Sequence, residues 1–142
     1  MECDTRVRAV LIDSGSATYE QLAPAMARSG IALRHATSPA GALHMAQVDR
    51  PDVALINLTM AGRLGDFSFS LLRLDGSTAS IPVVFLIDPL RWGRRANDAS
   101  ADALVPAPWR EERVFAAVHR VVRRNLAGSR SMQRSGEVYA EV

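Results

Sequence analysis

The feature that most constrains this chain is a fivefold alternation of short apolar runs with segments of helical spacing. The runs are rich in Val, Ile and Leu, which is typical of strands buried on both faces. They cover residues 6–12, 31–36, 53–58, 81–87 and 103–105. Helical patterns follow at residues 16–29, 38–49, 67–74, 91–100 and 111–126. This order predicts a three-layer α/β/α fold with a doubly wound, five-stranded parallel sheet.

Local signals support these boundaries. Gly30 stands where a helix would end, because glycine adopts the left-handed conformation of a C′ residue without steric cost. Ser38 is a good N-cap, and Pro39 suits the first helical position. We therefore expect helices to end before Gly30 and to begin after Ser38.

Length predicts one domain, because 142 residues are about the size of a single folding unit. We place this domain at residues 1–127 and expect residues 128–142, which lack periodicity, to form a flexible C-terminal tail. No apolar run approaches the ~20 residues of a membrane span, and no signal peptide is visible. Cys3 is the one cysteine, which excludes an internal disulfide and fits a cytoplasmic protein without a membrane partner.

The basic residues are unusual in kind and in distribution. All 17 are arginine, so a mechanism that needs lysine is excluded. Residues 110–134 hold seven arginines against Glu111 and Glu112, whereas residues 1–109 are nearly balanced. Such an asymmetry indicates either a solvated helix face or a surface for nucleic acid or an acidic partner.

The residues that follow the strands are the candidates for a functional site. In a doubly wound sheet the crevice lies at the carboxyl ends of the strands, near the point where the strand order reverses. The candidates there are Asp13, Ser14, Asn57, Ile87, Asp88 and residues 106–109.

These positions resemble those of the receiver domain of bacterial two-component response regulators. The likeness covers residues 6–127 and rests on PDVALINLTMAG (51–62), IPVVFLI (81–87) and ADALVPAPW (101–109), together with Asp13 and Gly30 at matching spacing. The resemblance implies the flavodoxin-like strand order 2-1-3-4-5. It also places Asn57 at the position of the phosphate-accepting aspartate.

The resemblance further implies that the phosphorylation pocket is degenerate. Of the acidic pair after the first strand only Asp13 remains, since Ser14 stands at the second position. Ile87 replaces the hydroxyl residue and Ala107 replaces the lysine. A neutral amide is a poor nucleophile, and a lone carboxylate should bind Mg²⁺ weakly or not at all. We therefore expect no phosphotransfer and no bound cofactor.

Two more positions follow from the same resemblance. Leu104 occupies the place of the aromatic residue that changes position on activation. The Ala107–Pro108 bond matches a bond that receivers often hold in cis, and we expect a cis peptide there.

The predicted function is that of a pseudo-receiver, a non-enzymatic module that binds a protein partner or a second copy of itself. Receivers commonly pair through the face of their fourth helix, fifth strand and fifth helix, and its candidate residues here are Trp92, Arg94, Arg95, Leu104, Trp109, Arg113 and Arg120. Packing is the alternative role for Trp109. Two other functions stay open: a Mg²⁺-dependent, phosphatase-like enzyme that uses Asp13, and a nucleic-acid binder that uses residues 110–134.

Overall fold

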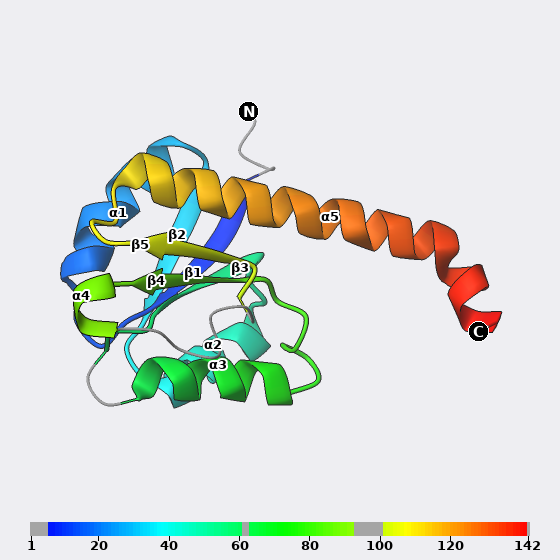
Figure 1. The fold of residues 1–142 in the computed structure, drawn as a ribbon, viewed down its shortest axis with the longest axis horizontal. Helices are drawn as coiled ribbons and strands as arrows, with labels where there is room; N and C mark the ends of the chain where they lie inside the picture. The colour runs from blue at the N-terminus through cyan, green and yellow to red at the C-terminus, as the bar shows by residue number, and fades with distance from the viewer. Residues whose placement is uncertain (1–5, 61–62, 93–100, 142) are drawn as a thin grey trace.

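The strands of the computed structural model form one parallel sheet in the order β2-β1-β3-β4-β5 (Figure 1). The structure describes residues 6–60, 63–92 and 101–141. Its strands are β1 (Val7–Ile12), β2 (Ile31–Ala36), β3 (Val53–Asn57), β4 (Val83–Ile87) and β5 (Ala103–Pro106). Its helices are α1 (Ala17–Arg28), α2 (Pro39–Val48), α3 (Leu64–Leu74), α4 (Pro89–Trp92) and α5 (Glu111–Glu141). The predicted fold class and strand order are confirmed.

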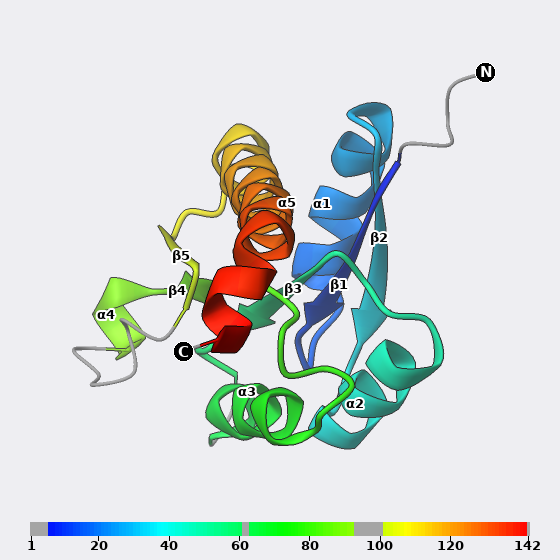
Figure 2. The ribbon, with the colours of Figure 1, turned by 90° about the vertical axis from the view of Figure 1, so that its right-hand side faces the viewer.

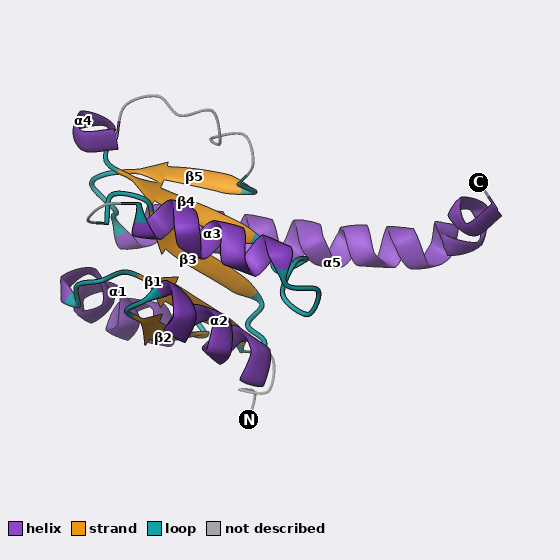
Figure 3. Cartoon of the chain, turned by 90° about the horizontal axis from the view of Figure 1, so that it is seen from below, coloured by secondary structure: helices purple, strands orange, loops and turns teal. Residues whose placement is uncertain are grey.

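The two faces of the sheet bury separate cores because successive side chains of a strand point to opposite sides. In β1, Ala9 and Leu11 belong to the core under α1 and α5, whereas Val10 and Ile12 belong to the core under α2 and α3. Figures 2 and 3 show these helix pairs on opposite faces. The central strand β3 is buried along its whole length, which explains its unbroken apolar pattern.

The local signals of the sequence act as expected. Ser38 accepts a hydrogen bond from the Gly41 backbone N–H at 3.0 Å, and Pro39 opens α2. Gly30 has a φ of 84°, which an L side chain rarely adopts. These residues set the turns that return the chain to β2 and α2.

The last two helices differ from their predicted bounds. Helix α4 starts at Pro89 rather than at Arg91, and residues 93–100 of the expected helix lie outside the described residues. Helix α5 continues to Glu141 instead of ending at Leu126, and it projects beyond the sheet in Figure 1.

Residues 128–141 continue α5 as a helix. The residues there are mostly of fair helix propensity, and Gly128 and Gly136 alone do not end the helix. Whether this part moves as a flexible tail stays a prediction.

Candidate functional site

The candidate site lies where the strand order reverses. Strand β1 pairs with β2 on one side and with β3 on the other, so the ends of β1 and β3 flank the point of reversal. Asp13 follows β1, Asn57 ends β3 and Ile87 ends β4. The structure thus brings together the predicted residues of three strands, as parallel pairing requires.

Asp13 is the one carboxylate of the predicted pocket, and it is 6% exposed. Its Oδ1 accepts a hydrogen bond from the Gly15 N–H at 3.3 Å, and its main-chain oxygen lies 2.9 Å from His35 Nε2. A carbonyl oxygen accepts only, so this His35 nitrogen is the donor. Asp13 is held by its own loop and by β2.

Met60 contacts the loop that follows Asp13. Its side chain is 5% exposed, and its sulfur accepts the Ser14 N–H at 3.1 Å. The contact joins the loop after β1 to the loop after β3. Ser14 itself is exposed, and no described hydrogen bond uses its hydroxyl group. A thioether thus lies against the loop in which the family would hold an acidic pair.

Asn57 is buried, with 8% of its surface exposed. Its Oδ1 accepts hydrogen bonds from the Thr59 N–H, at 2.9 Å, and from the Thr59 hydroxyl group. The amide oxygen is therefore engaged by a turn two residues on. Sequence reasoning missed Thr59 and the loop contact of Met60; the adjacent Asn57-x-Thr59 spacing, typical of an Asx turn, could have indicated the former.

The ends of β4 and β5 are joined by a loop that contains the predicted cis bond. The Ala107–Pro108 peptide is cis, as expected. The main-chain oxygen of Ile87 accepts the Ala107 N–H at 2.7 Å and Trp109 Nε1–H at 3.0 Å. Ile87 and Ala107 thus meet through the backbone, and neither offers a side-chain donor to an anion.

Trp109 has a structural role. Its indole N–H also donates to the Val105 oxygen at 3.1 Å, and its half-buried ring packs on the core under α1 and α5. The packing alternative explains this residue, and a contact with a partner stays a prediction.

The remaining candidates lie on the surface or outside the described residues. Leu104 is 39% exposed on β5, and Arg113 and Arg120 are exposed on α5. The three side chains line one hollow between these elements. Arg94 and Arg95 lie outside the described residues, and only the backbone of Trp92 is described.

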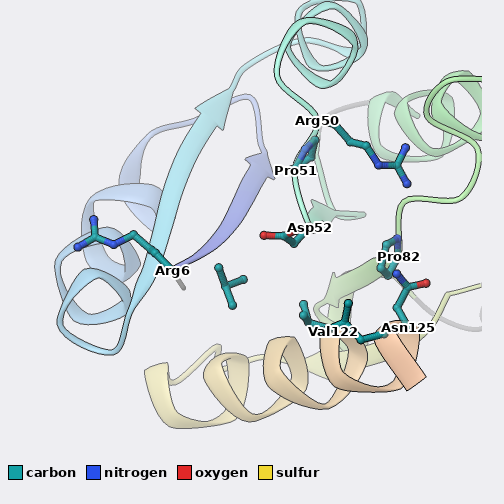
Figure 4. A pocket seen from close by; sticks show the side chains of 9 residues that line it. Arg6, Arg50, Pro51, Asp52, Pro82, Val122 and Asn125 are labelled. Carbon is teal, nitrogen blue, oxygen red and sulfur yellow. The ribbon is translucent and has the colours of Figure 1, made fainter. Parts of the chain in front are cut away.

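A different hollow, of about 290 Å³, lies at the amino ends of β1, β3 and β4 (Figure 4). Asp52 Oδ2 accepts the Arg8 N–H at 2.8 Å, and Arg50 donates to the Ser77 oxygen at 2.7 Å. These charged side chains at its rim therefore tie loops together. Figure 4 shows Arg6 directed away from the hollow.

Within the described parts of the chain, no group of three His, Cys, Asp or Glu side chains is placed to hold a metal ion. None of the described helices is long and apolar enough to cross a membrane.

The strand order and the paired helix layers agree with solved receiver structures. A response regulator from Desulfuromonas acetoxidans matches with a TM-score of 0.70 and 21% identity over 82% of this chain and 97% of that chain. The Francisella response regulator 1452 receiver domain matches with a TM-score of 0.70 and 17% identity over 84% and 98%. The chain has the receiver fold.

A sensor protein from Polaromonas sp. JS666 shares the receiver fold, with a TM-score of 0.75 and 17% identity over 84% of this chain and 98% of that chain. No protein-family model and no curated protein sequence matches the chain. The likeness therefore concerns the receiver fold, and function must be argued from the residues of the site.

Proposed function

We propose that this chain is a signalling domain of the receiver type that acts without phosphorylation, through contacts with another protein or with a second copy of itself. The observation that supports the proposal most directly is that Asn57 is buried and hydrogen-bonded. At the position of the phosphate acceptor stands a buried amide whose oxygen is bonded to Thr59. An amide is a poor nucleophile, and the oxygen of this amide is already bonded to Thr59.

The chemistry around Asn57 supports the same proposal. Transfer of a phosphoryl group to a receiver needs a carboxylate nucleophile and a metal ion that offsets the developing charge. Asp13 is the one acid among the predicted pocket residues, and Met60 packs against the adjoining loop. No lysine exists in the chain to bind the product. We infer that the domain is not an enzyme and needs no cofactor.

The interaction face that we propose is formed by β5 and α5, together with α4. Leu104, Arg113 and Arg120 are exposed there and line a common hollow. Arginine is enriched at contact surfaces, and the exposed Leu104 adds apolar area beside Arg113 and Arg120.

A phosphorylation assay tests this proposal. The chain is incubated with acetyl phosphate and Mg²⁺, and its intact mass is measured. We expect no phosphoryl adduct on the native chain. A receiver domain with a complete pocket is the positive control. A variant of this chain with the pocket rebuilt (Ser14→Asp, Asn57→Asp, Ile87→Thr, Ala107→Lys) shows whether the fold can still support the reaction. An adduct on the native chain at Asp13 or another pocket residue would contradict the proposal.

A further inference from the structure

A groove between β5 and α5 combines arginine side chains with an apolar floor. One hollow of about 210 Å³ is lined by Leu104, Pro106, Arg113, Ala116, Ala117 and Arg120, besides Val105. A wider hollow of about 570 Å³ shares Ala116 and Arg120 and adds Arg123 and Arg124. We call the two together the basic groove. Among the described residues, no acid lines either of them.

The arginines of the basic groove have no anionic partner in the described parts of the chain. Three arginines elsewhere form ion pairs: Arg8 and Arg34 bind Asp49 at 2.8 and 3.0 Å, and Arg73 lies 3.6 Å from Asp102. No such ion pair or side-chain hydrogen bond involves Arg113, Arg120, Arg123 or Arg124. Like charges held together without counter-charges attract an acidic ligand.

The nearest acids on the same elements are directed elsewhere. Asp102, just before β5, accepts the Val83 N–H at 2.8 Å and lies near Arg73. Glu111 and Glu112 line a hollow on the other flank of α5, with Arg28 and Phe115. Among the residues whose side chains the structure describes, no acid therefore neutralises the basic groove.

The floor of the basic groove favours a protein ligand over a nucleic acid. Leu104 is 39% exposed, and the exposed Ala116 lies with it in the lining, together with the buried Ala117. A protein binds the phosphate backbone of a nucleic acid mainly through its cationic side chains, and this binding does not require an apolar surface. A peptide with a large apolar side chain buries that side chain there while its carboxylates meet the arginines.

A second copy of this chain is a poor occupant. Two-fold pairing places the same surface of both copies against itself, and among its described lining residues this surface offers arginines but no acid to pair with them. In sequence, residues 91–100 add Arg91, Arg94 and Arg95 against Asp98 alone, which does not supply the missing counter-charge. Like charges facing each other across an interface are unfavourable.

We propose that the basic groove binds an acidic segment of a different protein, with at least one large apolar side chain seated beside Leu104. This inference rests on the proposed function, which allows either another protein or a second copy of the chain as the partner, and it selects another protein.

Selection from a random peptide library displayed on phage tests the inference, because it lets the groove choose its own ligands. Enriched peptides are synthesised with a fluorophore, and binding is measured by anisotropy on the full chain. We expect acidic peptides with one or more large apolar residues, bound more weakly as salt is added. Arg113→Glu/Arg120→Glu should weaken binding about tenfold or more, and Leu104→Ser severalfold.

The control variant is Arg6→Glu/Arg63→Glu, which makes the same change of charge at exposed arginines away from the basic groove. It should bind the peptides as the native chain does, and circular dichroism should show that all variants fold. Enrichment of neutral or basic peptides, no enrichment at all, or equal binding by the charge-reversed variant overturns the inference. So does a duplex oligonucleotide that competes for the groove.

Sedimentation separates this inference from the proposed function. A native dimer that Arg113→Glu/Arg120→Glu dissociates would identify a second copy as the occupant, which overturns the inference and leaves the proposed function standing. A phosphoryl adduct on the native pocket would overturn the proposed function whatever the peptides show.

Discussion

Gly65 allows the closest approach between α3 and the end of β3. A Cβ atom built there would lie 2.8 Å from the Asn57 main-chain oxygen and 2.9 Å from Leu58 Cα. Both atoms belong to the backbone of a buried segment, so neither can rotate away. The absence of a side chain at this position fixes how near the first turn of α3 comes to Asn57.

Substitution Gly65→Ala should therefore lower the free energy of unfolding by about 1–3 kcal/mol, the usual cost of forcing an extra methyl group into a packed site. Urea denaturation measures it. Gly76→Ala is the matched control, because a Cβ at Gly76 meets nothing within 4 Å. An unchanged midpoint for Gly65→Ala would show that α3 can move away from β3.

Some residues of the candidate site could be predicted from their positions in the sequence, whereas others are recognised only from how the folded chain packs. Asp13, Asn57 and Ile87 could be predicted because each follows or ends an apolar run, and parallel strands bring such ends together. Met60 could not, since its contact with the Ser14 N–H joins loops more than 40 residues apart in sequence.

At the scale of elements, Trp109 links the ends of β4 and β5. Its indole N–H is shared between the main-chain oxygens of Ile87 and Val105. Strand β5 has only four residues and pairs on one side with β4. A side-chain donor at its end is therefore a substantial part of what holds this edge strand in place.

We expect Trp109→Phe to reduce the free energy of unfolding by about 1–2 kcal/mol, because it keeps most of the apolar ring and removes the shared donor from two carbonyl groups. Chemical denaturation followed by circular dichroism measures the change. A second readout is amide hydrogen exchange, which should rise in β5 and stay unchanged in β1. Equal protection of β5 in both proteins would contradict the structural role of the indole.

The turn from α3 to β4 contains a carboxyl group with a perturbed pKa. The hydrogen bond from the Ser77 hydroxyl group holds the pKa of Asp75 below its ordinary value; Gln47 Nε2, 3.2 Å away, acts in the same direction, and desolvation opposes both. A carboxyl with a lowered pKa stabilises the fold above its unfolded-state pKa. That contribution disappears as the pH falls through the lowered, folded-state value.

Substitution Ser77→Ala should raise the pKa of Asp75 towards the ordinary value, as NMR titration of the side-chain carboxyl would report. The stability difference between native chain and variant should then be larger at neutral pH than in acid. Ser80→Ala is the control, because the Ser80 hydroxyl bonds Arg50 instead. A difference that grows on acidification would have the wrong sign.

Element boundaries are less predictable than element order. The apolar runs determine which segments become strands, because a strand that is buried on both faces needs apolar side chains at successive positions. The end of α5 lies beyond the sheet (Figure 1). A helix there needs no apolar stripe, and its sequence shows none. For the same reason the weakly patterned α4 begins two residues before its predicted start.

At the scale of the whole molecule, α5 has two parts. Val114, Ala117, Val118 and Val121 pack on the sheet and belong to one core, whereas Leu126 is already 52% exposed. The helix then continues to Glu141, about 20 Å further at 1.5 Å per residue. Among the described side chains, the part of α5 that packs on the core therefore ends at Val122.

A chain that ends after Ala127 should keep its cooperative unfolding, with a free energy of unfolding within about 1 kcal/mol of that of the full chain, because surface changes away from the core have small effects. Thermal and urea denaturation measure it, and the loss of helical dichroism should match the residues removed. A large loss of stability would show that the projecting part of α5 packs on the domain.

Trp109 can also serve as an intrinsic fluorescent probe. Its indole bonds Ile87 at the degenerate pocket and Val105 in the lining of the basic groove. The chain contains one other tryptophan, Trp92. In a Trp92→Phe background the emission of a single native fluorophore would report on both places at once, so occupancy of either could be followed without attaching a dye.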